Sequence, residues 1–314
     1  MDAKRSSYQP LSPQSRRISY MSLDFNLVQD YFRKLRKAIK GIRASSMPDD
    51  VHALRTQARH VEAILLAFQL ERKAVGSELL KSLKPIRKAA GEVRDMDVLI
   101  GFSSYLERAV DDQCLVQLLE FIGRHRAKSA KKLHKAVVNR RREARKSLRR
   151  CIRRIEDAVS SSKTSFSDSR MMSTNSMSVS FQLEAELANW PKLTEKNIHP
   201  FRLKVKELRY ILQLAKGSNS KFIKALGEVK DQIGAWHDWI ELATIAKNAL
   251  KHGDECGLNK QIQLRTKTEF IKALKVANAM RARYFNSETA RHRGKKSLPR
   301  LKASVISATS RLAV

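Results

Sequence analysis

The sequence predicts an all-α fold, and three observations lead to that prediction. Apolar residues recur at the three- and four-residue spacing of amphipathic helices along most of the 314 residues. No segment combines apolar–polar alternation with β-branched enrichment, the pattern that indicates a strand. Two blocks of sequence also occur twice in the same order. We therefore expect two helical-bundle repeats of about four helices each, related by a pseudo-twofold axis.

In the first half, amphipathic stretches separated by turn signals indicate the helices. Ser45–Asp50 is a turn, and its Pro48 suits the start of the next helix. Pro85 lies within the third stretch and predicts a kink or a late helix start, because proline lacks the backbone N–H. A further helix is expected to begin near Asp95. The expected helices cover residues 23–42, 51–68 and 78–90, a stretch that ends near 109, and 113–159.

The second half repeats this plan, starting with a copy of the helix at Val51–Phe68. A shift of 147 positions places that stretch on Ile198–Ala215 and aligns its apolar positions as well. At about 100° per residue, each copy has a buried stripe and, beside it, a ridge of one histidine and several cations. The ridge pairs are His52 with His199, Arg55 with Arg202, and Arg59 with Lys206.

A second block of sequence is repeated at a shift of 143 positions, and the change from 147 implies a small deletion between the blocks. It aligns Gly91, Arg94 and Asp95 with Gly234, His237 and Asp238. Each aspartate stands beside a basic residue at an expected helix start, which favours capping, or an ion pair that orients an arginine. The remaining expected helices cover residues 222–233, a stretch ending near 251, and about 260–284.

Composition divides the chain into two repeats and three connecting or flanking segments. Residues 160–180 hold ten serines and few large apolar groups, which predicts a flexible linker. The polar N-terminal stretch predicts a disordered tail, and the C-terminal stretch a loosely ordered basic one. The expected divisions are a tail 1–20, a domain 21–285 with repeat one 21–159, linker 160–180 and repeat two 181–285, and a tail 286–314.

The charge balance is the strongest indication of function. Lysine and arginine number 63 against 31 acidic residues, which gives a net charge of +32. So basic a surface is typical of proteins with a polyanionic partner, such as nucleic acid, an anionic membrane or a phosphate polymer. Two cationic ridges that face each other across the pseudo-twofold axis would line a central basic groove, where arginine and lysine bind phosphate well.

Aromatic residues make up 6% of the chain and are almost absent from the ridges. Proteins that bind single-stranded nucleic acid usually place aromatic rings among the cations, so that bases can stack on them. The composition therefore favours a chain of phosphates without bases. Non-specific binding to duplex nucleic acid also needs only cations, and it stays open as an alternative.

Other functional classes are disfavoured. The three cysteines lack the spacing of a disulfide framework or zinc site, and no Gly-rich phosphate loop with a following lysine is present. His52 and His60 are poorly spaced to share an ion. We expect no enzyme, metal or cofactor. The chain has no long apolar run and no secretory signal, which indicates an intracellular, cytoplasmic protein without a membrane partner; a basic cluster at 291–302 would suit a nuclear signal in a eukaryote.

The repeated motifs resemble the CHAD family, named for a conserved-histidine α-helical domain. The resemblance rests on His52-Ala-Leu-Arg55-Thr-Gln-Ala-Arg59 and Gly91-Glu-Val-Arg94-Asp95-Met-Asp97-Val98, each with its second copy. It covers about residues 23–285 and implies two four-helix bundles around a basic groove. Glu62 and Glu207 stand where the family pattern has basic residues, and Ile240 is the counterpart of Asp97, so the two copies are not expected to be fully symmetric.

The resemblance implies a non-enzymatic module that binds inorganic polyphosphate, and members of the family are associated with polyphosphate granules. The alternatives are a nucleic-acid-binding protein, for example an RNA-associated one, and a regulator or enzyme of polyphosphate metabolism. The resemblance assigns phosphate contacts to His52, Arg55, Arg59, His199, Arg202, Lys206 and Arg209, with a supporting set of Lys81, Lys84, Lys88, Arg94, Lys224, Lys230 and His237.

Overall fold

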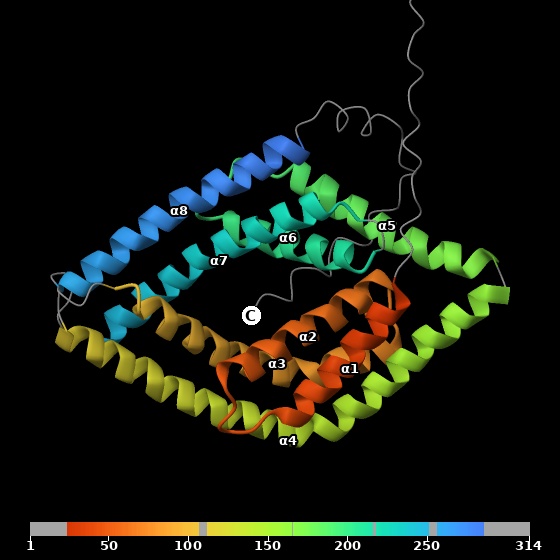
Figure 1. Ribbon diagram of the computed structural model, residues 1–314, viewed down its shortest axis with the longest axis horizontal. Helices are drawn as coiled ribbons and strands as arrows, with labels where there is room; N and C mark the ends of the chain where they lie inside the picture. The colour runs from red at the N-terminus through yellow and green to blue at the C-terminus, as the bar shows by residue number, and fades with distance from the viewer. Residues whose placement is uncertain (1–23, 107–111, 165, 216–217, 251–255, 286–314) are drawn as a thin grey trace, which may run out of the picture.

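The computed structural model describes residues 24–106, 112–164, 166–215, 218–250 and 256–285. Within these ranges the chain forms eight α-helices and no strand, which confirms the all-α prediction (Figure 1). The predicted tails 1–20 and 286–314 lie outside the described residues. The helices are α1 (Phe25–Gly41), α2 (Pro48–Ala67), α3 (Ala74–Ser103), α4 (Asp112–Thr164), α5 (Phe166–Ala188), α6 (Ile198–Gln213), α7 (Ser220–Ala249) and α8 (Gly257–Tyr284).

Two apolar cores hold the helices, one in each half of the chain. Helices α1–α4, here called the first half, bury one core, with Leu214 packed into it from beyond α6. Helices α5–α8, the second half, bury the other. A third cluster joins the ends of α3 and α7 to the starts of α4 and α8, at the left of Figure 1. The halves are therefore tied together at that end by shared apolar packing.

The helices begin and end much as the sequence predicts in α1, α2 and α6. Asp24 caps α1, since its carboxylate accepts hydrogen bonds from the backbone N–H groups of Asn26 and Leu27. Pro48 opens α2, and the carboxylate of Asp50 accepts from the backbone N–H of Met47. These contacts satisfy donors that have no partner within the helix.

The predicted helix breaks between residues 90 and 95 and between 233 and 238 are wrong, and so is a late helix start at Pro85. A kink at Pro85 stays a prediction. Helix α3 runs unbroken through Pro85 and Gly91, and α7 runs unbroken through Gly234. A proline within a helix costs about 3 kcal/mol, but Leu83 and Ile86 on either side of it are 1% exposed. Burying each such side chain stabilises by about 1.5–3 kcal/mol, which is enough to keep the helix continuous. Asp95 and Asp238 therefore lie inside helices and cap neither.

Helical backbone also covers most of the segment that the sequence predicts to be a linker. Helix α4 extends to Thr164 and α5 begins at Phe166, so residues 160–164 and 166–180 are helical. The segment still connects the two halves, and its flexibility stays a prediction.

Figure 1 shows α4 along the lower edge of the molecule and α5 and α8 along the upper edge, with α2 and α6 between them. Helix α4 packs against α1 and α3, and α7 packs against α6 and α8. Helices α2 and α6 contact each other across the junction of the halves. None of the described helices is long and apolar enough to cross a membrane.

Candidate functional site

The apolar stripes of α2 and α6 are buried as predicted, which fixes how the cationic ridges are oriented. On α2 the buried positions include Leu54, Ala58 and Val61, and on α6 they include Phe201 and Val205. A ridge beside a buried stripe must stay near the surface, where a ligand can reach it. Because the two helices also contact each other, their ridges come together at the junction of the halves.

Arg55 on α2 reaches across to α3. Its Nη1 donates to the Asp95 carboxylate at 3.1 Å and to the Gly91 carbonyl at 3.4 Å. A Cβ added at Gly91 would lie 3.3 Å from that nitrogen. The glycine thus gives the guanidinium room to lie against the helix. The ion pair that the sequence suggested for Asp95 is confirmed, and it holds Arg55 in place.

Arg202 on α6 lies against α7 in a corresponding way. Its Nε donates to the Lys230 carbonyl at 3.0 Å, and a Cβ added at Gly234 would lie 2.8 Å from its Nη2. Burial lowers the pKa of Arg202, and the negative charge of Asp238 opposes that shift. Arg202 therefore stays cationic while most of its surface is shielded from water.

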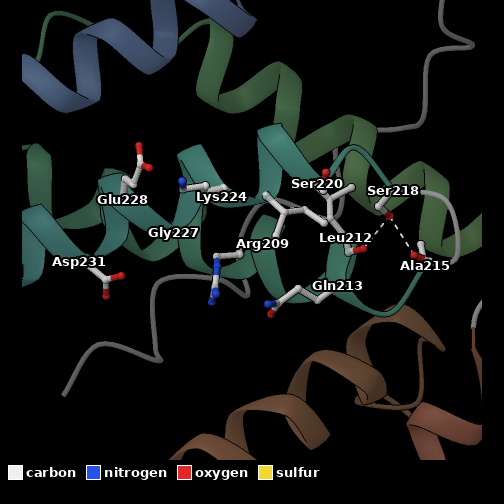
Figure 2. A pocket seen from close by; sticks show the side chains of 11 residues that line it. Arg209, Leu212, Gln213, Ala215, Ser218, Ser220, Lys224, Gly227, Glu228 and Asp231 are labelled. Atoms are coloured by element: carbon white, nitrogen blue, oxygen red, sulfur yellow. Dashed lines mark hydrogen bonds between the residues drawn. The ribbon is translucent and has the colours of Figure 1, made fainter.

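Arg209, about two turns further along α6 than Arg202, lies over a third glycine. A Cβ at Gly227 would lie 3.2 Å from the Arg209 Nε. Arg209, Lys224 and Gln213 line a hollow of about 610 Å³, and Figure 2 shows these side chains between α6 and α7. Ser218 closes one side of the hollow, because its Oγ donates to the carbonyls of Leu212, in the last turn of α6, and of Ala215, just after it. The hollow leaves Arg209 accessible to a solute.

Glu62, the acid at the position equivalent to Arg209, is neutralised within the first half. It pairs with Arg59 at 3.1 Å and with Arg87 at 2.7 Å. Its side chain is 17% exposed. The carboxylate is thus paired with two cations, one of which is the ridge residue Arg59.

Lys206 shows that cations of both halves converge. Burial and the positive charges of Arg59, Arg202 and Arg55 together lower its pKa to about 7, against the opposing effect of Glu62. Arg55 and Arg59 belong to α2, so the field at this α6 lysine comes from both helices. A group whose charge is suppressed by neighbouring cations regains its proton when an anion binds beside it.

Unpartnered donors mark the same surface. Within the described residues, the buried Nε atoms of Arg59 and Arg209 and the buried Nδ1 of His199 have no hydrogen-bond partner. Buried polar atoms in folded proteins are nearly always paired, so each exception indicates a bound solute or a functional role. Two guanidinium donors suit an oxyanion better than any neutral group.

The ridge histidines lie at the other end of the surface. Burial lowers the pKa of His52, with further lowering by Arg94 and by Lys230 of the second half. Burial and the neighbouring His237 lower the pKa of His199, and the two rings lie 4.8 Å apart. The Nδ1 of His237 is 3.9 Å from the Asp238 carboxylate. His52 and His199 thus gain charge when an anion approaches them.

Four of the supporting residues lie away from the cations that surround Lys206. Lys81, Lys84 and Lys88 are exposed along α3, and Lys224 is exposed at the hollow beside Arg209. Arg94 and Lys230 lie closer to the ridges, since the charge of each lowers the pKa of His52. The predicted site residues therefore divide into a central set on α2 and α6 and a peripheral set of exposed lysines.

Sequence reasoning missed the glycines and the residues that surround the ridges. Gly91 and Gly234 were visible as an echo, but their role as seats for arginines needs the packing of α2 on α3 and α6 on α7. His60, weighed in the sequence as a metal ligand, is buried, stacks on Tyr31 at 4.0 Å and meets Tyr210 edge-on. Burial lowers its pKa to about 4, so it is a neutral core residue.

The described residues contain no cluster of three or more histidine, cysteine or acidic side chains that could hold a metal ion. The site is built instead from guanidinium, ammonium and imidazole groups, which are donors without ligand lone pairs when charged. Such a set suits an anion, to which these groups can offer hydrogen bonds and charge.

The fold and this surface define an all-α protein with a cationic surface at the junction of its two halves. The CHAD domain family model matches residues 26–247. The crystal structure of the CHAD domain from the plant Ricinus communis is similar, with a TM-score of 0.58 and 13% sequence identity over 88% of this chain and 97% of that one. No curated protein matches the sequence. The chain belongs to the CHAD domain family.

Proposed function

We propose that this protein binds inorganic polyphosphate along the facing ridges of α2 and α6, in a basic groove between two related helical repeats. It would act as a targeting module for polyphosphate, including polyphosphate granules, within the cell. The proposed contacts are His52, Arg55, Arg59, His199, Arg202, Lys206 and Arg209, with Lys81, Lys84, Lys88, Arg94, Lys224, Lys230 and His237 in support.

One observation carries this proposal: the charge of Lys206 is suppressed by arginines of both halves. A cluster of like charges is unfavourable without a counter-ion of high charge density. A phosphate chain supplies one charge per repeat and can follow the ridges. The buried, unpartnered donors of Arg59 and Arg209 supply hydrogen bonds that dissolved salt does not replace equally well.

The aromatic residues near the surface favour phosphate over nucleotide bases. Tyr31 and Tyr210 both contact the buried ring of His60, and burial raises the pKa of both phenols. Rings engaged with one another offer less stacking surface to a base. Membership of the CHAD family supports the same choice and supports binding without catalysis.

The test is a titration series with long-chain polyphosphate, single-stranded RNA and duplex DNA at matched salt, with free phosphate monitored. We expect the tightest binding per charge for polyphosphate, a steep fall with salt as counter-ions are released, by analogy with nucleic acid, and no phosphate release. Equal affinity per charge for the three polymers would indicate a general polyanion binder. Mg²⁺-dependent phosphate release would indicate an enzyme.

Two variants locate the site. Arg55→Ala with Arg202→Ala should weaken polyphosphate binding strongly and leave helicity intact. Lys267→Ala with Lys275→Ala is the matched control, because it removes the same charge from exposed positions on α8. Equal losses from the two double variants would contradict a site on α2 and α6.

A further inference from the structure

A second cationic surface lies on α4, far from the ridges of α2 and α6 in the fold. Between residues 124 and 154 this helix holds 15 lysines and arginines and one acid, Glu143. The first half of that stretch presents Arg124, Lys128, Lys131 and Lys135. The second half presents Arg142, Lys146, Arg149 and Arg153. We call these eight residues the outer row.

The outer row faces away from the core, and the helix that carries it bends near its middle (Figure 1). At about 100° per residue, its eight positions fall within a sector of roughly 60° on the helix. All eight are exposed. The opposite side of the same stretch buries Leu133, Val137, Ala144, Leu148 and Ile155 in the core of the first half. Since that buried side packs on α1 and α3, the outer row lies on the outer edge of the molecule (Figure 1).

No ion pair neutralises the outer row within the described part of the chain. The acids near α4 pair with other cations of the helix: Asp97 with Arg126, Glu92 with Lys132, Glu143 with Arg140, and Glu78 with Arg150. At about 100° per residue, Lys132 and Arg150 lie on one flank of the row, and Arg126 and Arg140 lie toward the side that packs on the core. These acids thus pair away from the row and leave its eight cations without an ion pair among the described residues.

This arrangement is unfavourable for the helix by itself. Cations three and four residues apart are neighbours on a helix surface, and like charges at these spacings destabilise it. Arg142, Lys146 and Arg149 are neighbours of this kind, and so are the cations of the first part of the row. A ligand of opposite charge that lies along the helix relieves the repulsion at every step.

The shape of the row selects among polyanions. From Arg124 to Arg153 it extends about 45 Å at the rise of an α-helix. A flexible chain of phosphates can follow this bent row, whereas a duplex is stiff over this length and meets the row at only a few points. This stretch also has no Phe, Tyr or Trp on which single-stranded bases could stack. Its exposed large apolar side chain is Val138, too little for a membrane-surface helix.

We infer that the outer row is a second binding surface for a linear, unstacked polyanion, with inorganic polyphosphate as the ligand class. The inference takes this ligand class from the proposed function but stands on a different surface. A protein with two such surfaces joins two chains, or holds one long chain at two places. Joining sites raises avidity once a chain is long enough to span them, so long chains should bind more tightly per phosphate than short ones.

Isothermal titration of the full-length protein with a short, length-fractionated polyphosphate tests the inference. The wild type should bind two chains. The triple variant Arg142→Gln, Lys146→Gln and Arg149→Gln should bind one, with a salt dependence reduced by roughly one unit for each lost contact. Lys260→Gln, Lys267→Gln and Lys275→Gln on α8 is the control of equal charge and should bind two. Circular dichroism should show unchanged helicity in both variants.

The outcomes separate this inference from the proposed function. If the row variant still binds two chains with the wild-type salt dependence, the outer row is not a site. If duplex DNA displaces the row-bound chain at equal charge, the assignment to a linear polyanion is overturned. If Arg55→Ala with Arg202→Ala keeps two chains while the row variant keeps one, the proposed site on α2 and α6 fails and the outer row stands.

Discussion

The ridges of α2 and α6 differ most at one equivalent position, which is Glu62 in the first half and Arg209 in the second. Glu62 binds Arg59 and Arg87, so the first ridge carries its own counter-ion. Arg209 lies in a hollow, and its buried Nε has no partner among the described residues. The second ridge should therefore supply more of the binding energy, while the first is held partly by its own ion pairs.

The largest expected effect comes from making the second ridge resemble the first. Arg209→Glu should lower polyphosphate affinity by roughly tenfold to a hundredfold, because a hydrogen bond to a charged group contributes about 1.5–3 kcal/mol and tenfold in affinity is about 1.4 kcal/mol. Equilibrium titration measures the change. Lys267→Glu on α8 makes the same change in net charge and should have little effect. Equal losses would mean that only net charge matters.

A smaller effect is expected from filling the seats of the arginines. Gly234→Ala places a Cβ 2.8 Å from the Arg202 Nη2, and Gly91→Ala places one 3.3 Å from the Arg55 Nη1. Alanine favours a helix by about 1 kcal/mol over glycine, so thermal stability should hold or rise. Affinity should fall by roughly tenfold for Gly234→Ala and by less for Gly91→Ala. The reverse order would contradict the assigned role of the glycines.

The pH dependence should follow Lys206, whose pKa burial lowers to about 7 from 10.5. Between those values the unfolded chain holds the extra proton, so this residue makes the free energy of unfolding rise with pH. Polyphosphate favours the charged lysine, so affinity should fall as pH rises through 7. Lys206→Met should remove both effects and weaken binding. Denaturation and titration from pH 6 to 9, roughly the window where Lys206 loses its proton, measure them.

The smallest effect should come from Glu62→Gln. This change frees Arg59 and Arg87 from a carboxylate that each contacts. Partly exposed ion pairs contribute at most about 1 kcal/mol, so affinity should rise by a few-fold. Glu269→Gln, which frees Lys272 on α8, is a control with the same charge change outside both proposed surfaces. An equal rise with Glu269→Gln would mean that only net charge matters.

The sequence alone predicted which faces of α2 and α6 are buried, because their apolar stripes recur at helical spacing without an interruption. It was insufficient at Gly91 and Gly234, where glycine is typical of a helix end. Their actual role is to admit an arginine from a neighbouring helix, and that depends on packing between residues far apart in sequence. Gly227 had no echo at all, since its counterpart is Lys84.

Asp97 and Ile240 show the same limit at a position where the two copies disagree. The Asp97 side chain is 2% exposed and accepts from the Arg126 Nε of α4 at 2.6 Å. Ile240 instead packs against the apolar core of the second half. At this equivalent position, each half thus carries the side chain that its own neighbours can pair with or pack against. This departure from symmetry therefore belongs to the interior of the halves, whereas the one between Glu62 and Arg209 lies on the ridges.

The most direct test of a site shared by the two halves compares polyphosphate titrations of the wild type, Arg55→Ala, Arg202→Ala and the double variant. If the site is shared, each single change weakens the binding of all polyphosphate at α2 and α6. The double change then weakens it by about the product of the two factors. The contradictory result is that each single change removes part of the bound polyphosphate and leaves the remainder at wild-type affinity, as two independent sites would.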